Sequence, residues 1–132
     1  MTSSELYHTN RKIFSIEEID ISPDVEVIWL NENFIEEVSG LEGKISVKEL
    51  YLHSNNIDTL VNSSLSSLKF LEVLTLDGNQ LTDLHDQLDV LSNLRYLERL
   101  DMRENPMGET GSLLFILCSS FHHSFIISFS VT

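Results

Sequence analysis

Four segments of the chain share one pattern of leucine-like residues, and each carries an asparagine at the same point. They read VEVIWLNENFIEEV (25–38), VKELYLHSNNIDTL (47–60), LEVLTLDGNQLTDL (71–84) and LERLDMRENPM (97–107). The shared pattern is L-x-x-L-x-L-x-x-N-x-L, with Val, Ile or Met in place of some leucines. One such repeat cannot bury its apolar side alone, so the copies must stack and share one core. The chain is therefore constrained to a solenoid, a class of fold that offers partners a broad surface.

The asparagines of the pattern are predicted to be structural. Asn33, Asn55, Asn79 and Asn105 follow one another at spacings of 22, 24 and 26 residues. The chain must turn sharply behind each strand, which leaves backbone groups near the core without sheet partners. Buried polar groups need hydrogen bonds, and an Asn side chain supplies an acceptor and two donors. We therefore expect stacked asparagines to hydrogen-bond neighbouring turns.

Alternation within each strand separates core residues from surface residues. Leu50 and Leu52 flank Tyr51, and successive side chains of a strand point to opposite faces. The two leucines are therefore predicted to face inward and Tyr51 outward. The same alternation assigns these further strand residues to the core: Ile28, Leu30, Leu74, Leu76, Leu100 and Met102. Positions eleven and fourteen of the pattern return to the core after the turn, at Ile35, Ile57, Leu81, Met107, Val38, Leu60 and Leu84.

Over residues 25–107, and with a cap over 13–107, these motifs resemble the leucine-rich repeat family. The resemblance implies an α/β fold: a right-handed solenoid with a short parallel sheet on the concave face and 3-10 or short helices on the convex face. The short repeats are similar to the intracellular subclass that includes nuclear phosphatase-regulatory and axonemal dynein light-chain proteins. The lengthening spacing and the ending N-P-M further resemble small leucine-rich repeat proteins of cilia and flagella.

The chain is predicted to be one domain. Residues 1–24 form a polar N-terminal segment and cap, in which 1–12 are loosely ordered and 13–24 form an irregular strand or turn. The leucine-rich repeat domain spans residues 25–109, with repeats at 25–46, 47–70, 71–96 and 97–109. The connections between strands are predicted to be a tight turn or extended segment at 39–46, a helical turn at 61–70 and a true helix at 85–96.

The last residues, 110–132, contain no Lys, Arg, Asp or Glu. A transmembrane helix needs about 20 mostly apolar residues and usually basic flanks. The segment 113–131 is marginal on both counts, so membrane insertion is not expected. Three interpretations stay open: a C-terminal cap, a weak tail anchor, or an atypical ending from a translated intron or shifted frame. The last is favoured because members of the subclass continue after N-P with a helix and a Leu-x-x-Leu-Asp strand, which this chain lacks.

Charge and cysteine content limit the partners and the compartment. With 21 acidic and 8 basic residues the formal net charge is −13. Nucleic-acid phosphates are bound by Lys and Arg, so direct nucleic-acid binding is not expected, whereas basic proteins are suitable partners. A single cysteine, Cys118, excludes an internal disulfide framework. No signal-peptide pattern begins the chain, so we expect an intracellular, cytoplasmic protein. The family resemblance adds the cilium or flagellum as a candidate location.

The outward strand positions form the candidate site. Trp29 and Tyr51 should be neighbours because adjacent strands lie about 4.8 Å apart. Aromatic residues and Arg are enriched at binding hot spots. An alternative is that Trp29 lies under the N-terminal segment as part of the cap. The charged positions farther along either pair with one another or steer a partner. The candidate protein-binding residues are Trp29, Tyr51, Glu49, His53, Val73, Thr75, Asp77, Arg99, Asp101 and Arg103.

The sequence contains no catalytic, metal-binding or phosphate-binding pattern. Cys118 has no basic residue near it, and the pair His122-His123 has no neighbouring carboxylate. We therefore predict no enzyme activity and no cofactor. The predicted function is a monomeric interaction module that binds a protein through its concave face, in a ciliary or cytoskeletal scaffold. Two alternatives remain open: a regulatory subunit of an enzyme such as a protein phosphatase, and a tail-anchored membrane adaptor.

Overall fold

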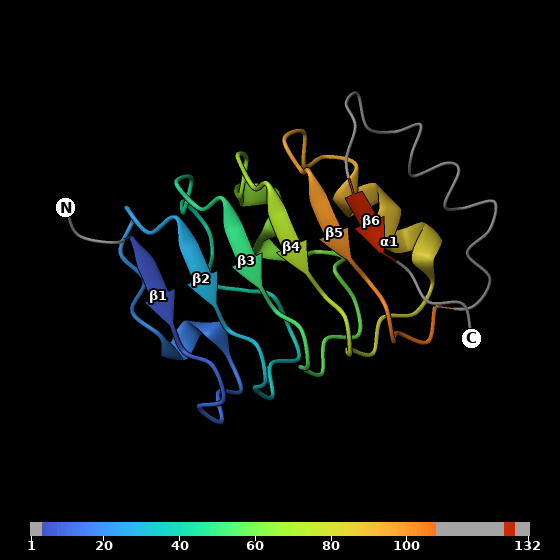
Figure 1. The fold of residues 1–132 in the computed structure, drawn as a ribbon, viewed down its shortest axis with the longest axis horizontal. Coiled ribbons are helices and arrows are strands. Elements are labelled where there is room, and N and C mark those ends of the chain that lie inside the picture. Colours follow the sequence, from blue (N-terminus) through green and yellow to red (C-terminus); the bar gives the residue numbers. More distant parts are fainter. Residues whose placement is uncertain (1–3, 108–125, 129–132) are drawn as a thin grey trace.

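Six short strands lie side by side in one sheet, and the connections between the first five stack behind it (Figure 1). The computed structural model describes residues 4–107 and 126–128. The strands follow one another in chain order, and every neighbouring pair is parallel. Their bounds are β1 (Glu5–Tyr7), β2 (Val27–Trp29), β3 (Glu49–Tyr51), β4 (Val73–Thr75), β5 (Arg99–Asp101) and β6 (Ile126–Ser128). Each turn of the chain therefore adds one strand, which confirms the predicted α/β solenoid with a parallel sheet.

The three connections from β2 to β5 gain helical structure as they lengthen. The structure has 3-10 helices η1 (Ile16–Glu18) and η2 (Ser64–Ser67), and an α-helix, α1 (Leu84–Leu91). Turns and bends without a helix fill residues 39–46, where Gly40 and Gly43 have positive φ angles. The predicted order of tight turn, helical turn and true helix is therefore confirmed. The longest of these three connections is the one with enough residues for an α-helix.

The core lies between the sheet and these connections. Leu50 and Leu74, at the centres of β3 and β4, are 0% exposed, whereas the strand residues on either side of them are partly exposed. The residues that follow each turn are buried as predicted: Ile35, Ile57, Leu81, Met107, Val38, Leu60 and Leu84. Stacked copies of one pattern therefore form a single continuous core.

The four asparagines connect each repeat to the one before it. The Asn79 side chain donates to the carbonyl oxygen of Leu76 in its own repeat and to that of Leu52 in the preceding repeat, both at 3.0 Å. Its Oδ1 atom accepts from the Ile57 backbone N–H, also at 3.0 Å. Asn55 repeats this arrangement one turn earlier and donates to the same Leu52 carbonyl. Each asparagine is nearly fully buried, so the predicted structural role is confirmed.

A left-handed residue recurs in the turns that follow β2, β3, β4 and β5. Glu32, Ser54, Gly78 and Glu104 have φ angles of 60°, 59°, 69° and 58°. A side chain in this conformation costs roughly 1–2 kcal/mol, and glycine avoids the cost. Three of these four turns therefore contain local strain that the stacked core and the asparagine hydrogen bonds must offset.

The N-terminal segment differs from the prediction. Residues 1–12 were expected to be loosely ordered, with an irregular strand or turn in 13–24. Instead β1 lies at Glu5–Tyr7, in register with β2. The repeat is hard to detect because Arg11 occupies the position of the asparagine. Asn33 of the next repeat compensates, since its Oδ1 accepts from the Arg11 and Ile13 N–H groups at 2.9 and 3.1 Å.

At the other end, β6 continues the sheet beside β5, with Arg99 opposite Ile126. The predicted cap, anchor and altered-ending interpretations concern mainly residues 108–125 and 129–132, which lie outside the described residues. Cys118, His122 and His123, for which no catalytic or metal-binding role was predicted, lie there too. Within the part that the structure describes, no helix is long and apolar enough to span a bilayer.

Candidate functional site: the outer face of the sheet

Three aromatic rings stack across the first three strands on the outer face of the sheet. Tyr7, Trp29 and Tyr51 stand opposite one another in the strand register. The ring centroids of Trp29 and Tyr51 are 3.7 Å apart with an interplanar angle of 6°. Those of Tyr7 and Trp29 are 6.0 Å apart at 10°. We call these three residues the aromatic ladder. It arises because equivalent positions of consecutive repeats are brought side by side.

Carboxylates flank the aromatic ladder on the same face. The Tyr51 hydroxyl donates to Glu49 Oε1, and the Tyr7 hydroxyl donates to Glu5 Oε2, each at 2.5 Å. In both cases the glutamate lies two residues earlier on the same strand, so both side chains share one face. Burial, together with the hydrogen bond to Glu49 and its negative charge, raises the pKa of Tyr51 to about 12.

Trp29 is partly buried, and its ring lies between that of Tyr7, from the N-terminal segment, and that of Tyr51. β1 lies beside β2 in the sheet, so that segment flanks Trp29 and extends the ladder through Tyr7. Trp29 Nε1 is buried and has no hydrogen-bond partner among the described residues. The N-terminal segment therefore contacts one side of Trp29, and both the cap role and the binding role stay predictions.

The outer face becomes polar toward β4 and β5. His53 Nδ1 lies 2.8 Å from Thr75 Oγ1, and the His53 ring meets Tyr51 edge-on at 6.5 Å. Arg103 binds the Asp101 carboxylate with two hydrogen bonds, 3.0 Å from Nε and 2.6 Å from Nη2. Arg103 therefore pairs within its own repeat and not across strands, and steering of a partner by these charges stays a prediction.

The pKa values of the two aspartates in this polar half are shifted in opposite directions. Burial and the negative charge of Asp101 raise the pKa of Asp77. Burial also raises the pKa of Asp101, but the hydrogen bonds and positive charge of Arg103 outweigh it, so the pKa lies below its usual value. Asp77 is therefore the less favourably placed carboxylate, and a cationic partner group would stabilise its charged form.

All ten predicted site residues share this face. The remaining column, Glu49, Val73 and Arg99, lies in register across β3, β4 and β5. Tyr7 and Glu5 were missed by the sequence prediction, although a signal existed: the tripeptide E-L-Y occurs at both 5–7 and 49–51. The identical triplets occupy equivalent strand positions and make the same Tyr–Glu hydrogen bond.

Comparison with known proteins decides the family. A family model described as Leucine rich repeat matches residues 45–107. This chain is a leucine-rich repeat protein. It is 36% identical over 74 residues to leucine-rich repeat-containing protein 56 of Rattus norvegicus, covering 56% of this chain and 12% of that protein.

The names of two further relatives mention an activity or an association. The leucine-rich repeat protein is 35% identical over 106 residues to "MAP kinase phosphatase with leucine-rich repeats protein 1" of Dictyostelium discoideum, covering 74% of this chain and 12% of that one. It is 34% identical over 79 residues to "187-kDa microtubule-associated protein AIR9" of Arabidopsis thaliana, covering 60% and 5%. The chain thus spans at most 12% of the length of these relatives.

A solved structure supports the fold independently. The protein chain in the crystal structure of the TLR13–ssRNA13 complex superposes with a TM-score of 0.65 at 19% sequence identity, covering 94% of this chain and 21% of that one. At this identity the similarity establishes the solenoid fold alone.

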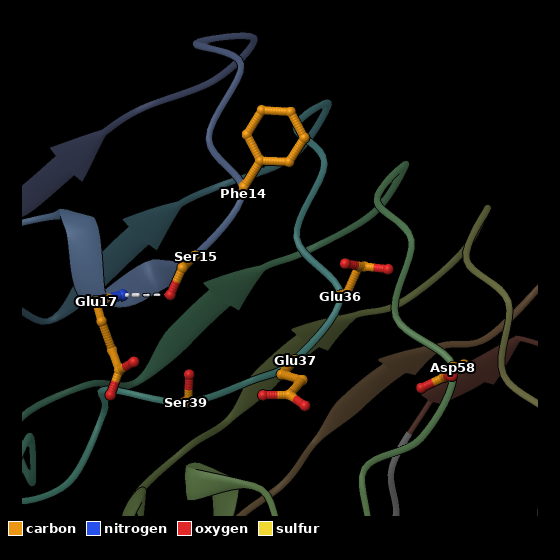
Figure 2. Close-up of a pocket in the computed structure, with 7 residues that line it drawn as sticks. All are labelled: Phe14, Ser15, Glu17, Glu36, Glu37, Ser39 and Asp58. Atoms are coloured by element: carbon orange, nitrogen blue, oxygen red, sulfur yellow. Dashed lines mark hydrogen bonds between the residues drawn. The ribbon is translucent and has the colours of Figure 1, made fainter.

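An acidic hollow lies away from the outer face of the leucine-rich repeat protein, beside the N-terminal segment and the turns of the first two repeats. The hollow has a volume of about 400 Å³. Figure 2 shows the residues that line it: Phe14, Ser15, Glu17, Glu36, Glu37, Ser39 and Asp58. Among the described residues, no group of three or more His, Cys, Asp or Glu side chains could hold a metal ion. The hollow is therefore an acidic surface feature without a metal-binding arrangement.

The raised pKa of Tyr51 predicts a loss of stability at high pH. The folded pKa of about 12 exceeds the ordinary value of 10.0, so the folded state retains its proton more strongly than the unfolded state. This contribution is fully present below about pH 10 and is lost as the pH rises toward about 12. Ultraviolet titration of tyrosinate should show a tyrosine that ionises near pH 12 and is missing from Tyr51→Phe. The thermal unfolding temperature of Tyr51→Phe should fall less steeply over the same pH range than that of the natural chain. An equal fall in both proteins would contradict the assignment.

Proposed function

We propose that this leucine-rich repeat protein is a non-catalytic interaction module that binds a basic segment of a protein partner on the outer face of its sheet. The aromatic ladder carries the proposal, because its rings and the neighbouring carboxylates form one continuous surface. The proposed contact residues are the ten predicted from the sequence together with Glu5 and Tyr7.

The chemistry of the ladder fits cationic side chains. Tyr and Trp provide large contact areas with little loss of conformational freedom. Lys and Arg bind favourably over aromatic faces, and Arg also forms hydrogen bonds with carboxylates. Both faces of Trp29 lie against the rings of Tyr7 and Tyr51, so a cation would bind over the remaining faces of the two tyrosines. Glu49 lies beside Tyr51, within the same surface. The net charge of −13 further attracts basic partners over longer distances.

The polar half of the face is suited to fixing the position of the partner. Asp101 is paired with Arg103, whereas Asp77 has a raised pKa and lies near the negative charge of Asp101. A cation of the partner placed at Asp77 would relieve this repulsion. Charge complementarity of this kind determines register and specificity more than affinity.

The broader role that we propose is a cytoskeletal scaffold, with the cilium or flagellum as its location. One relative is named a microtubule-associated protein, and the motif spacing resembles small ciliary repeat proteins. The second candidate is regulation of an enzyme, which is favoured by the relative named a MAP kinase phosphatase with leucine-rich repeats.

Affinity capture from ciliated and non-ciliated cell extracts tests the outer face. The full chain is compared with Trp29→Ala/Tyr51→Ala, and with Phe14→Ala/Phe34→Ala as a matched control. Phe14 and Phe34 are also stacked, at 5.2 Å, and both are exposed on another side of the molecule. Loss of the ladder should weaken specific binding at least about tenfold, as expected for hot-spot aromatics. The control variant should bind as the natural chain does.

The identity of the captured protein separates the two roles. Cytoskeletal proteins enriched from ciliated extract would support the scaffold. One phosphatase catalytic subunit whose rate changes on binding would support regulation. The assignment of the site is wrong if the ladder variant has an unchanged circular dichroism spectrum and still retains the same specific proteins.

A further inference from the structure

A second surface lies at the edge of the sheet where the chain enters β3, β4 and β5. Ile45, Phe70 and Tyr96 each precede one of these strands by three or four residues. These residues are 55%, 47% and 54% exposed; single exposed apolar residues are normal, but a contiguous patch of them marks an interaction site. They recur once per repeat, so stacking of the repeats aligns them along one side of the solenoid.

Two adjoining hollows run between these residues and share Phe70. The first encloses about 390 Å³ and is lined by Glu26, Ile45, Ser46, Lys48 and Phe70. The second encloses about 490 Å³ and is lined by Ser66, Lys69, Phe70, Asn93, Arg95 and Tyr96. The rings of Phe70 and Tyr96 are 5.5 Å apart, tilted by 35°. We call the two hollows together the entry groove, and it extends across three repeats.

The entry groove is basic although the protein is strongly acidic. Three of the eight basic residues, Lys48, Lys69 and Arg95, line it. Lys48 lies 3.7 Å from the Glu26 carboxylate. Lys69 and Arg95 are exposed and form no ion pair with the residues that the structure describes. Two cations therefore stand beside two exposed aromatic rings with their charge uncompensated.

We propose that the entry groove binds an acidic segment of a protein partner that also carries an aromatic or aliphatic side chain. Lys69 and Arg95 meet its carboxylates, and Phe70 and Tyr96 contact its apolar side chain. The charge of the groove selects this occupant, because a basic segment would be repelled here and attracted to the outer face of the sheet. The proposal is independent of the function proposed for the aromatic ladder.

Fluorescence anisotropy with a defined peptide tests the entry groove. The probe is a fluorescein-labelled peptide, DEFDELD, and its amide analogue NQFNQLN is the uncharged comparison. The full chain should bind DEFDELD with an affinity that falls as salt rises. Lys69→Glu/Arg95→Glu should weaken binding at least about tenfold. The matched control Arg11→Glu/Lys12→Glu changes the net charge equally at two other exposed cations, and it should change binding by less than about twofold.

Several results would overturn the proposal. These are equal binding of NQFNQLN, an equal loss in the Arg11→Glu/Lys12→Glu control, or no saturable binding up to about 1 mM peptide. Tighter binding of a short single-stranded oligonucleotide would assign the groove to nucleic acid. If the chain self-associates and Lys69→Glu/Arg95→Glu abolishes this self-association, the groove would be assigned to a second copy of the chain. Retention of peptide binding by Trp29→Ala/Tyr51→Ala shows that the two surfaces act separately.

Discussion

Replacing Asn79 with alanine should lower the free energy of unfolding by about 2–4 kcal/mol. The Ile57 backbone N–H, which is buried, loses the acceptor that Asn79 supplies at 3.0 Å. The carbonyl groups of Leu52 and Leu76 each lose one of the donors that they receive. An unsatisfied buried donor costs about 1–3 kcal/mol, and the weakened carbonyl contacts and the small cavity add to this.

Urea denaturation followed by circular dichroism measures the effect. Asn56→Ala is the matched control, because its side chain is exposed in the preceding turn, and it should change stability by less than about 0.5 kcal/mol. A loss below about 1 kcal/mol for Asn79→Ala would mean that water replaces the side chain, and it would contradict the structural role.

A double-mutant cycle tests whether the asparagines act as a connected ladder. Asn55 and Asn79 donate to the same Leu52 carbonyl oxygen, each at 3.0 Å. Their substitutions should therefore not be additive, with a coupling of at least about 0.5 kcal/mol. Asn33 and Asn105 lie at opposite ends of the array and do not share an acceptor, so their effects should add.

Leu74→Ala should destabilise the protein by about 2–5 kcal/mol and should also divide its unfolding into two parts. Leu74 is 0% exposed at the centre of β4. In a repeat protein each unit contacts its neighbours alone, so weakening a central unit uncouples the two ends. The neighbouring substitution Val73→Ala, on the half-exposed side of the same strand, should cost less than about 1 kcal/mol.

The single tryptophan makes the uncoupling measurable. Trp29 lies on β2 and reports the N-terminal repeats, whereas circular dichroism reports the whole chain. The two urea transitions should coincide in the natural protein and separate in Leu74→Ala. If Leu74→Ala is destabilised as expected but its two transitions still coincide, the array unfolds as one unit.

Much of the fold could be predicted from the sequence because the spacing of residues within each repeat determines which side chains face the core. The alternation around Leu50 and Leu74 identified the inward residues, and Asn79 marked the turn. The same alternation correctly placed Trp29 and Tyr51 together on the outer face. These inferences succeed because each depends on positions within one repeat or at equivalent points of neighbouring repeats.

Other features could not be predicted from the sequence, since they depend on a side chain of one repeat that forms a hydrogen bond with the backbone of another. Arg11 replaces the asparagine of the first turn, and the strand Glu5–Tyr7 was missed for that reason. Gln87 looks like a surface residue of a polar helix, yet it is buried and its Oε1 accepts from the Leu60 N–H at 2.6 Å. In both cases a group from the following repeat satisfies the backbone of the preceding one.

By itself, the sequence determined the solenoid, its core and the column that holds Trp29 and Tyr51, because leucine spacing fixes which side of each turn is buried. The tertiary structure alone decided that Tyr7 completes the aromatic ladder and that Phe70 and Tyr96 border a basic groove. These residues are more than twenty positions from the neighbours that they contact. Their proximity follows from the stacking of repeats of unequal length, which sets how surface side chains align.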